Sequence, residues 1–284
     1  MSTYRILYNP FAANNAGEEG AKKLSSMLEG KTVFEDMTKL DYREFFRNLD
    51  PEEKVVVAGG DGTLNRFVND TRDVNIKNGL YYFAAGTGND FLFDLGKKPE
   101  DGLVDLAPYI KDLPSVTVKG QTRLFLNNAS FGIDGYCCEE GDRLKEKSDK
   151  PVNYTSIAIK GLLGKFKPVN AKITVDGVTT EYKKVWLAPS MNGRACGGGM
   201  LLAPAQDRLN KEHKVSVVVY HGCGPLRALM VFPSIFKGEH IKHEKIVKVI
   251  EGNDVTVEFD RPTPMQIDGE TIKNVTKYHV RTAK

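Results

Sequence analysis

The first 115 residues alternate apolar runs of strand type with segments whose apolar residues recur at helical spacing. The strand-type runs lie at residues 4–10, 31–37, 53–60 and 79–86. In the helical pattern after the first run, Ala21, Leu24 and Leu28 fall on one face. Strands that alternate with helices predict a doubly wound, Rossmann-like α/β domain with a parallel sheet, whose ligands bind at the carboxyl ends of the strands.

From about residue 116 the pattern changes to short β-type runs that are separated by glycine, asparagine or aspartate. Runs at this spacing predict an antiparallel β-sandwich. Two segments, 153–166 and 224–238, have helical spacing instead. The change of pattern predicts two domains, residues 1–115 and 116–284, and leaves open that the extreme C-terminus packs back on the first domain.

The bulk composition is that of an ordinary globular chain, with 284 residues of which 40% are hydrophobic and 27% are charged. A formal net charge of +3 is too small to indicate a nucleic-acid-binding surface. The cysteines have no metal-binding spacing and the start of the chain has no secretory leader, which predicts buried thiols in a reducing cytosol. No apolar stretch approaches the roughly 20 residues of a membrane span. We therefore expect a cytoplasmic protein whose contact with a bilayer is peripheral.

The first candidate site is the turn after the third apolar run, "GGDGT" at residues 59–63. Its glycines let the backbone turn sharply and approach a ligand, and the following helix offers free N–H groups and a positive dipole end to a phosphate. Asp61 would repel that phosphate, which makes sense where it binds a magnesium ion or a donor group beside the phosphates. The alternative is a tight surface turn in which Asp61 caps the helix.

A second turn repeats this device after the next apolar run, with Gly86 and Gly88 around Thr87. Asn89 and Asp90 then open a helix. Turns on neighbouring parallel strands would face one crevice, which favours a ligand site over two unrelated turns. Capping of the helix by Asn89 or Asp90 is the structural alternative.

Six motifs occur in order along the chain: "YNPFAANNAG", "GGDGTLN", "GTGNDF", "NNASFGIDG", "NGRACGGGMLLAP" and "MQIDGE". Together they resemble the diacylglycerol kinase catalytic family, in particular its bacterial soluble lipid kinases, over nearly the whole chain. The motif "GGDGT" alone is shared with NAD kinases, so the order of all six motifs carries the resemblance. The resemblance implies a lipid kinase that uses ATP and Mg²⁺, although no metal-ligand cluster can be read from the spacing of the acidic residues.

The resemblance also implies which residues hold the nucleotide, and all of them are in the first domain: Asn9, Thr38, Gly60, Asp61, Gly62, Thr63 and Thr87. Asn89 and Asp90 would shape the second turn. In the second domain Glu270 would be the general base that takes the proton of the lipid hydroxyl. Asp268 would support a metal or orient Glu270, and closing of a cleft between the domains would bring base and phosphate together. Without the resemblance to the family, a plain β-turn is the better interpretation of "IDGE" at residues 267–270, because Asp-Gly is a strong hairpin signal.

One segment departs from the family pattern. Many bacterial members carry an Asp-Gly pair after the glycine-rich loop, tied to an additional metal site. This chain has "APAQDRLNKEHK" instead, with Glu212 and His213 near that place. We therefore assign no residues to an additional metal site.

Diacylglycerol is the first expectation for the acceptor, but the motifs describe the phosphate end of the reaction and leave other lipid alcohols open. A second hypothesis is phosphorylation of a soluble acceptor such as NAD, and a third is a nucleotide- or lipid-binding protein without turnover. We expect an apolar cleft whose wall includes the loop 197–200 and side chains near Phe131 and Ile133. The apolar segment 228–236 and the basic residues after it form a candidate contact with an anionic membrane, or else a core-facing helix. Self-association is left open.

Overall fold

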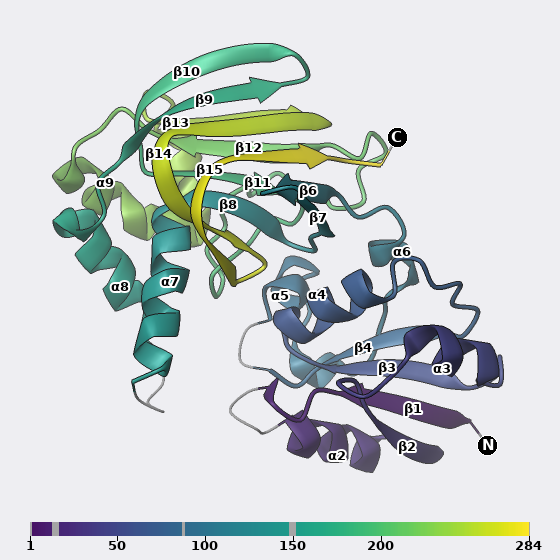
Figure 1. Ribbon diagram of the computed structural model, residues 1–284. Coiled ribbons are helices and arrows are strands. Elements are labelled where there is room, and N and C mark those ends of the chain that lie inside the picture. Colours follow the sequence, from purple (N-terminus) through teal and green to yellow (C-terminus); the bar gives the residue numbers. More distant parts are fainter. Residues whose placement is uncertain (1, 13–16, 87–88, 148–151, 284) are drawn as a thin grey trace. The chain divides into compact units, whose positions relative to one another are not determined.

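The computed structural model describes residues 2–12, 17–86, 89–147 and 152–283 (Figure 1). The chain forms two compact units, Met1–Lys111 and Asp112–Lys284. Each unit is built on its own β-sheet. Among the described helices, none is both long enough and apolar enough to cross a membrane.

The sheet of the first unit has the strand order β2-β1-β3-β4-β5. Its strands are β1 (Thr3–Tyr8), β2 (Lys31–Asp36), β3 (Lys54–Gly59), β4 (Leu80–Ala84) and β5 (Val104–Asp105). All neighbouring strands are parallel except β4 and β5, which are antiparallel. In the inner strand β3, Val55, Val56 and Val57 are fully buried. Such a run is typical of a parallel strand that is covered on both faces.

Helices cover both faces of this sheet (Figure 1). They are α2 (Gly17–Met27), α3 (Tyr42–Asn48), α4 (Asp61–Asp70), α5 (Asp90–Asp94), the 3₁₀ helix η1 (Pro99–Asp101) and α6 (Ala107–Ile110). On one face, Leu24 of α2 packs in a cluster with Val56 and Ala58 of β3. On the other side of the sheet, the rings of Phe67 in α4 and Tyr42 in α3 meet edge to face, with centroids 5.7 Å apart. The predicted doubly wound α/β architecture is confirmed.

The second unit is built on one antiparallel sheet of ten strands. They are β6 (Ser115–Val118), β7 (Gln121–Leu124), β8 (Asn128–Gly132), β9 (Val169–Val175), β10 (Val178–Val185), β11 (Leu187–Met191), β12 (Val215–Tyr220), β13 (Val247–Gly252), β14 (Asp254–Ile267) and β15 (Glu270–Arg281). The main path runs β13-β12-β11-β8-β14-β15-β6-β7, and the hairpin of β9 and β10 joins through β14. The predicted antiparallel β domain is confirmed.

The long strand β14 lets this sheet fold over on itself to enclose a core. Its first half pairs with β9, as in Val255 with Val175, whereas its end pairs with β8, as in Met265 with Phe131. Between the layers, Phe131 stacks on Phe259 with ring centroids 4.4 Å apart. The inward residues of eight strands share this cluster, so it is the main core of the unit.

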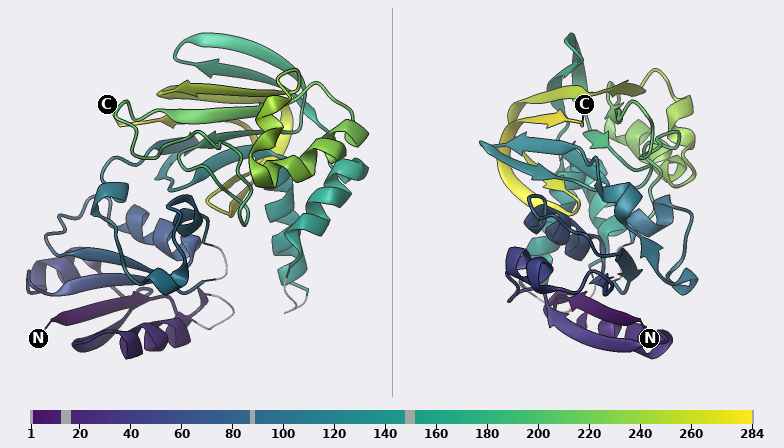
Figure 2. Two further views of the ribbon diagram at one scale, coloured as in Figure 1. Left: turned by 180° about the vertical axis from the view of Figure 1, so that it is seen from behind. Right: turned by 90° about the vertical axis from the view of Figure 1, so that its right-hand side faces the viewer.

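A helical layer packs on the outer face of the second sheet (Figure 2). It consists of α7 (Ile133–Lys145), α8 (Tyr154–Lys160), the π-helix η2 (Gly161–Lys165), α9 (Pro225–Val231) and the 3₁₀ helices η3 (Phe232–Lys237) and η4 (Glu239–Lys242). The sequence predicts the segments around α8 and α9 but not α7. Glycine is unfavourable inside a helix, yet a Cβ at Gly135 would lie 2.3 Å from the carbonyl oxygen of Pro264. Close packing, which no local pattern reveals, therefore requires that glycine.

Candidate functional site

The predicted nucleotide residues of the first unit gather at one edge of its sheet. Asn9 follows β1, Thr38 follows β2, and Gly60 follows β3. These three strands are parallel neighbours, so their carboxyl ends meet at the same edge. The turn after β4 ends there as well, since β4 is parallel to β3. The structure thus brings together at one edge those predicted nucleotide residues that it describes, Asn9, Thr38 and residues 60–63.

The two glycine turns touch each other through their backbones. A Cβ added at Gly86 would lie 2.6 Å from the Cα of Gly60, so no larger residue fits at Gly86 without a shift. The amide of Ala85 donates to the carbonyl of Gly59 at 2.9 Å and joins the ends of the two strands. Gly62 is exposed in the first turn of α4, and a Cβ there would meet no atom within 4 Å. Gly86 therefore permits the close contact between the two backbones, whereas Gly62 leaves the first turn of α4 open to solvent.

Asp61 is buried, with 9% of its surface exposed, and it belongs to both turns. Its Oδ2 accepts a hydrogen bond from the amide of Asp90 at 2.6 Å, and its Oδ1 accepts one from the amide of Phe91 at 3.2 Å. The carboxylate therefore caps α5, the neighbouring helix, where a negative charge is favoured by the helix dipole. The alternative interpretation, a surface turn in which Asp61 caps a helix, is therefore right about capping but wrong about the surface, and the capped helix is α5.

The side chains of Asn89 and Tyr82 donate hydrogen bonds to backbone carbonyls of the two glycine turns. Asn89 is the N-cap residue of α5, but its side chain does not cap the helix; its Nδ2 donates to the carbonyl of Gly86 at 2.8 Å. The Tyr82 hydroxyl donates to the carbonyl of Gly59 at 3.0 Å, and burial raises its pKa well above the usual range, with a smaller contribution from Asp61. The alternative that Asn89 or Asp90 caps α5 is therefore wrong, because Asp61 does so.

Asn9 and Thr38 make local turns at the ends of their strands. The Oδ1 atom of Asn9 accepts a hydrogen bond from the amide of Phe11 at 3.0 Å. The hydroxyl and amide of Thr38 both donate to Oδ1 of Asp36, at 2.7 and 2.9 Å. The hydrogen bond from the Thr38 hydroxyl is the main reason that the pKa of Asp36 is lowered. Thr87, the remaining predicted nucleotide residue, lies outside the described residues together with Gly88.

In the second unit, Asp268 and Gly269 form the turn of the hairpin between β14 and β15. Both residues have positive φ, 45° and 91°, and Ile267 pairs with Glu270 across the turn. This is the tight hairpin that Asp-Gly favours. The geometry places Glu270 as the first residue after the turn.

The Asp268 carboxylate is bound to the backbone of the segment before β8. It accepts hydrogen bonds from the amides of Leu126, Asn127 and Asn128, at 2.5, 2.8 and 2.9 Å. Carboxylates that accept several backbone N–H groups are held firmly in place. The turn that carries Glu270 is therefore anchored to residues 126–128.

Glu270 is about half exposed, and its carboxylate is paired with Arg123 on β7. The Nη1 atom of Arg123 donates to Oε2 of Glu270 at 2.7 Å. Sequence reasoning misses Arg123, because 147 positions separate the two residues and no pattern along the chain connects them.

The glycine-rich loop forms a small closed turn of the second unit. Cys196 and Met200 exchange two backbone hydrogen bonds of 3.1 Å, and the three glycines between them all have φ between 62° and 94°. Other residues rarely adopt this conformation. Phe131 is fully buried in the core, and a cleft wall formed by side chains near it stays a prediction.

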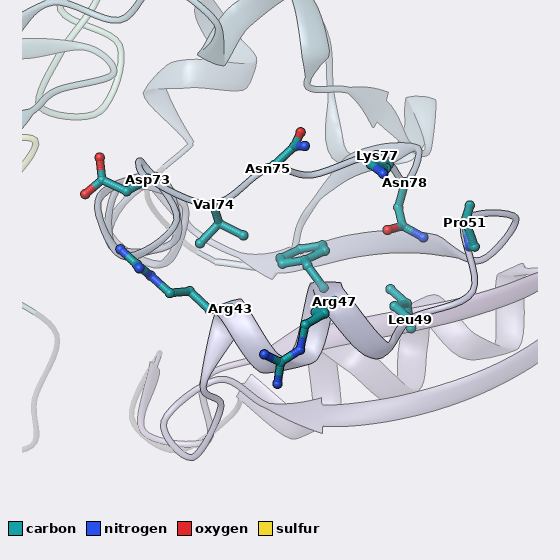
Figure 3. Close-up of a pocket in the computed structure, with 10 residues that line it drawn as sticks. Arg43, Arg47, Leu49, Pro51, Asp73, Val74, Asn75, Lys77 and Asn78 are labelled. Atoms are coloured by element: carbon teal, nitrogen blue, oxygen red, sulfur yellow. The ribbon is translucent and has the colours of Figure 1, made fainter.

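A cavity of about 360 Å³ lies in the first unit, but at the opposite ends of the strands (Figure 3). Arg43 and Arg47 of α3 line it together with Lys77 in the loop before β4. Since β3 and β4 begin near this cavity and end at the glycine turns, the cavity is separate from the candidate site.

No group of three or more histidine, cysteine, aspartate or glutamate side chains that could hold a metal ion occurs in the described part of the chain. In the segment that departs from the family pattern, polar side chains bind one another. Lys214 is paired with Glu212, and Asn210 donates to the carbonyl of Lys214 at 2.9 Å.

Two family models match successive parts of the chain. Residues 3–113 match the diacylglycerol kinase catalytic domain. Residues 127–281 match the YegS C-terminal NAD kinase beta sandwich-like domain, which alone is more than half of the chain. The chain therefore belongs to the family that carries this YegS C-terminal domain, with a diacylglycerol kinase catalytic domain as its first part.

Curated relatives of this family member come from several bacteria. A diacylglycerol kinase of Bacillus subtilis is 25% identical over 288 residues, covering 95% of this chain and 90% of the relative. A diacylglycerol kinase of Staphylococcus carnosus is 27% identical, and the match covers 94% of this chain and 88% of the relative. The match to a diacylglycerol kinase of Mycobacterium tuberculosis is 26% identical over 68% of this chain and spans 63% of the relative, less than two thirds of its length.

Solved structures of other proteins share the fold. A structure described as a diacylglycerol kinase from Bacillus anthracis is 18% identical, with a TM-score of 0.62, and the match covers 100% of this chain and 94% of that one. Another structure from the same organism reaches a TM-score of 0.69. At this identity the likeness supports the two-domain architecture of the family member and no more.

Proposed function

We propose that this protein is an ATP-dependent kinase that transfers the γ-phosphate of ATP to the hydroxyl group of a lipid. The observation that carries the proposal is the pair of glycine turns in backbone contact, Gly60 against Gly86, inside a domain that matches the diacylglycerol kinase catalytic domain. The first turn leads into α4, a helix of 10 residues whose N-terminus attracts phosphate. Exposed Gly62 leaves that N-terminus accessible.

In the proposed reaction, the oxygen of the lipid hydroxyl attacks the γ-phosphorus of ATP. The proton of that hydroxyl passes to Glu270, and ADP leaves. Glu270 is suited to the task because its carboxylate is exposed, and its turn is anchored through Asp268. Phosphoryl transfer depends mainly on positioning and on neutralisation of charge. We assign nucleotide contact to Asn9, Thr38, Thr87 and the turn 60–63, with Asp61 keeping the two turns together.

Mg²⁺ is implied by the chemistry of ATP. The described residues hold no preformed cluster of metal ligands. Magnesium usually keeps most of its bonds to water and to substrate phosphates, with one or two carboxylates from the protein. We therefore propose that Mg²⁺ arrives with ATP and supplies charge neutralisation on the phosphates.

Diacylglycerol is the first candidate acceptor. The B. subtilis and S. carnosus relatives, which align over nearly the whole chain, carry the name diacylglycerol kinase. Another relative is named only as a lipid kinase, a YegS-like protein of Shewanella frigidimarina. Support for this acceptor comes from those names, whereas the lipid class as a whole is also supported by the family of the catalytic domain.

Access to a lipid requires contact with a bilayer, and the helical layer of the second unit offers a surface for it. Leu226 and Met230 on α9 are each 74% exposed, and Leu163 on η2, which packs against α9, is 60% exposed. Exposed basic residues flank them, including Arg227 and Lys165. Exposed apolar side chains among cations are suited to an anionic membrane surface. The inner face of α9 packs on the core, so this helix both contacts the core and presents apolar residues outward.

The decisive experiment supplies ATP labelled at the γ-phosphate to the purified protein with a total lipid extract, diacylglycerol or NAD. Label in a lipid band that requires ATP supports the proposal, and a band at phosphatidic acid identifies diacylglycerol. Label only on NAD would replace the lipid kinase with a soluble-acceptor kinase. ATP binding without transfer to any of these acceptors would favour a binding protein.

A further inference from the structure

One peptide group lies between two oppositely charged side chains. The carbonyl of Leu126 accepts hydrogen bonds from Nη1 of Arg208, at 3.3 Å, and from Nδ2 of Asn192, at 2.8 Å. The N–H of the same peptide, on Asn127, donates to Oδ1 of Asp268 at 2.8 Å. The cation thus meets the oxygen end of this peptide dipole and the anion meets its hydrogen end.

The arginine binds the neighbouring side chain as well. Nη2 of Arg208 donates to Oδ1 of Asn127 at 3.0 Å, so the guanidinium holds a main-chain oxygen and a side-chain oxygen of adjacent residues. Leu126 and Asn127 are both buried, at 0% and 3% exposed. Hydrogen bonds with a charged partner are stronger than neutral ones, and bonds in series polarise one another where water is excluded. The contact from Arg208 therefore strengthens the bond from Asn127 to Asp268.

The turn beyond Asp268 depends on this contact for its position. The amide of Asp268 donates to the carbonyl of Asn128 at 3.0 Å, and the amide of Gly269 donates to Oε1 of Gln266 at 2.8 Å. Glu270 follows immediately. A shift of residues 126–128 would therefore move the turn and the carboxylate that comes after it.

We propose that Arg208 is a positioning residue, which acts through the Leu126–Asn127 peptide and Asp268 to hold Glu270 in its working position. The inference rests on the proposed role of Glu270 as general base. Arg208 lies in the segment between the glycine-rich loop and β12, the part of the chain that departs from the family pattern.

The test compares Arg208→Met with Arg261→Met. Arg261 is a matched control, because it also donates to backbone carbonyls of the second unit, those of Lys167 and Pro168, away from the turn. For Arg208→Met we expect kcat to fall about tenfold to a hundredfold, as for a misplaced catalytic group, with KM for ATP within about twofold of the parent. Arg261→Met should keep the parent kcat.

Two further variants separate positioning from general destabilisation. In the double variant Arg208→Met with Glu270→Gln, kcat should be little lower than in Glu270→Gln alone, since both changes act on the same carboxylate. Addition of methylguanidinium to Arg208→Ala should recover part of the lost kcat. An unchanged kcat in Arg208→Met, or full additivity with Glu270→Gln, would overturn the proposal.

Amide hydrogen exchange provides a readout that does not need turnover. Arg208→Met should lower the protection of the amides of residues 126–128 relative to the parent and to Arg261→Met. Equal protection would overturn the proposal even in a variant with reduced kcat. If the parent protein phosphorylates no lipid, the proposed function fails, whereas the exchange data still decide whether Arg208 holds the segment. If Arg208→Met does not fold, Arg208→Lys, which keeps the charge but loses the two-pronged contact, takes its place.

Discussion

Arg123 and Glu270 form an ion pair between β7 and the start of β15, with Nη1 and Oε2 2.7 Å apart. Both side chains are about half exposed, so the pair contributes little to the stability of the fold. The ion pair instead affects how the carboxylate of the proposed base, Glu270, is oriented. The Glu270 carboxylate is therefore oriented by a partner on another strand as well as by the turn that precedes it.

Replacement of Arg123 by glutamine should lower turnover modestly, by at most about fivefold, because an exposed ion pair contributes at most about 1 kcal/mol to the orientation of the carboxylate. Steady-state kinetics on the preferred lipid measures this effect. The double variant with Glu270→Gln should be no slower than Glu270→Gln alone. A further loss in the double variant would show that Arg123 acts independently of Glu270.

Replacement of Glu270 by glutamine keeps the shape of the side chain and removes its capacity to accept a proton. We expect kcat to fall by ~10²–10⁴-fold, the usual range for loss of a general base, with ATP binding unchanged. Glu258→Gln is the control, since Glu258 is a partly exposed glutamate of the same hairpin that is likewise paired with a cation, Lys277. Lost ATP binding in a folded Glu270→Gln protein would instead assign Glu270 to the nucleotide.

Replacement of Asp61 by alanine should abolish transfer and also destabilise the first unit. The change removes the acceptor of two helix N-terminal amides, and loss of such a cap costs about 1–2 kcal/mol. Asp61→Asn keeps one oxygen acceptor and should fold better while remaining inactive. Thermal unfolding and transfer assays measure the two effects separately.

Asp41→Ala is the matched control for this loss of a cap. Asp41 caps α3 through Oδ1, which accepts from the amides of Arg43 and Glu44 at 2.9 and 3.1 Å. We expect a similar loss of stability with full activity. If Asp61→Asn is as active as the parent, Asp61 is structural only.

Polar substitutions on α9 should weaken membrane binding without loss of fold. Leu226→Ser with Met230→Ser removes two exposed apolar side chains, whereas Val178→Ser removes one that is 71% exposed on β10, outside the helical layer. Sedimentation with vesicles containing phosphatidylglycerol should show reduced binding for the α9 variant alone. Equal binding of all proteins would exclude α9 from the membrane contact.

Thiol chemistry should follow the surroundings of Cys137, which is buried, and of Cys138, which is half-buried. Burial is the main cause that raises the pKa of Cys138 to about 12, and burial also raises that of Cys137. Because an unfolded thiol ionises near pH ~8.5, these groups favour the native state below that pH, and the free energy of unfolding should fall as the pH rises from about 8.5 to 12. Alkylation by iodoacetamide at pH 8.5 should be slow in native protein and fast in urea. Equal rates would show that these thiols are accessible.

The sequence predicts the architecture well because hydrophobic periodicity reports burial directly. The buried valines of β3 and the one-sided pattern of α2 each identify an element without any tertiary information. The same reasoning does not predict the helix α7, because Gly135 is explained only by the backbone of β14, and Gly141 only by the ring of Tyr154 in α8, which pack against them. Local propensity was overridden there by tertiary packing.

The candidate site was predictable as a set of motifs but not as a set of contacts. The strand-turn-helix pattern places Asp61 correctly after β3. Its carboxylate, however, binds amides 29 and 30 positions away, and nothing along the chain indicates that partner. Arg123 and Arg208 were missed for the same reason, since arginine on a strand or in a loop is most often a solvated side chain.

The topology of the second unit also determines when it can fold during synthesis. Its earliest strand, β6, pairs with its latest, β15, as in Ser115 with Arg281, and β14 joins three other strands. Contacts of such long sequence separation form slowly, because a large loop must close first. Nearly the entire unit must therefore leave the ribosome before its sheet can close, whereas the sheet of the first unit is complete by Asp105. A nascent chain stalled near residue 250 would carry a finished α/β sheet beside unpaired, aggregation-prone β-strands.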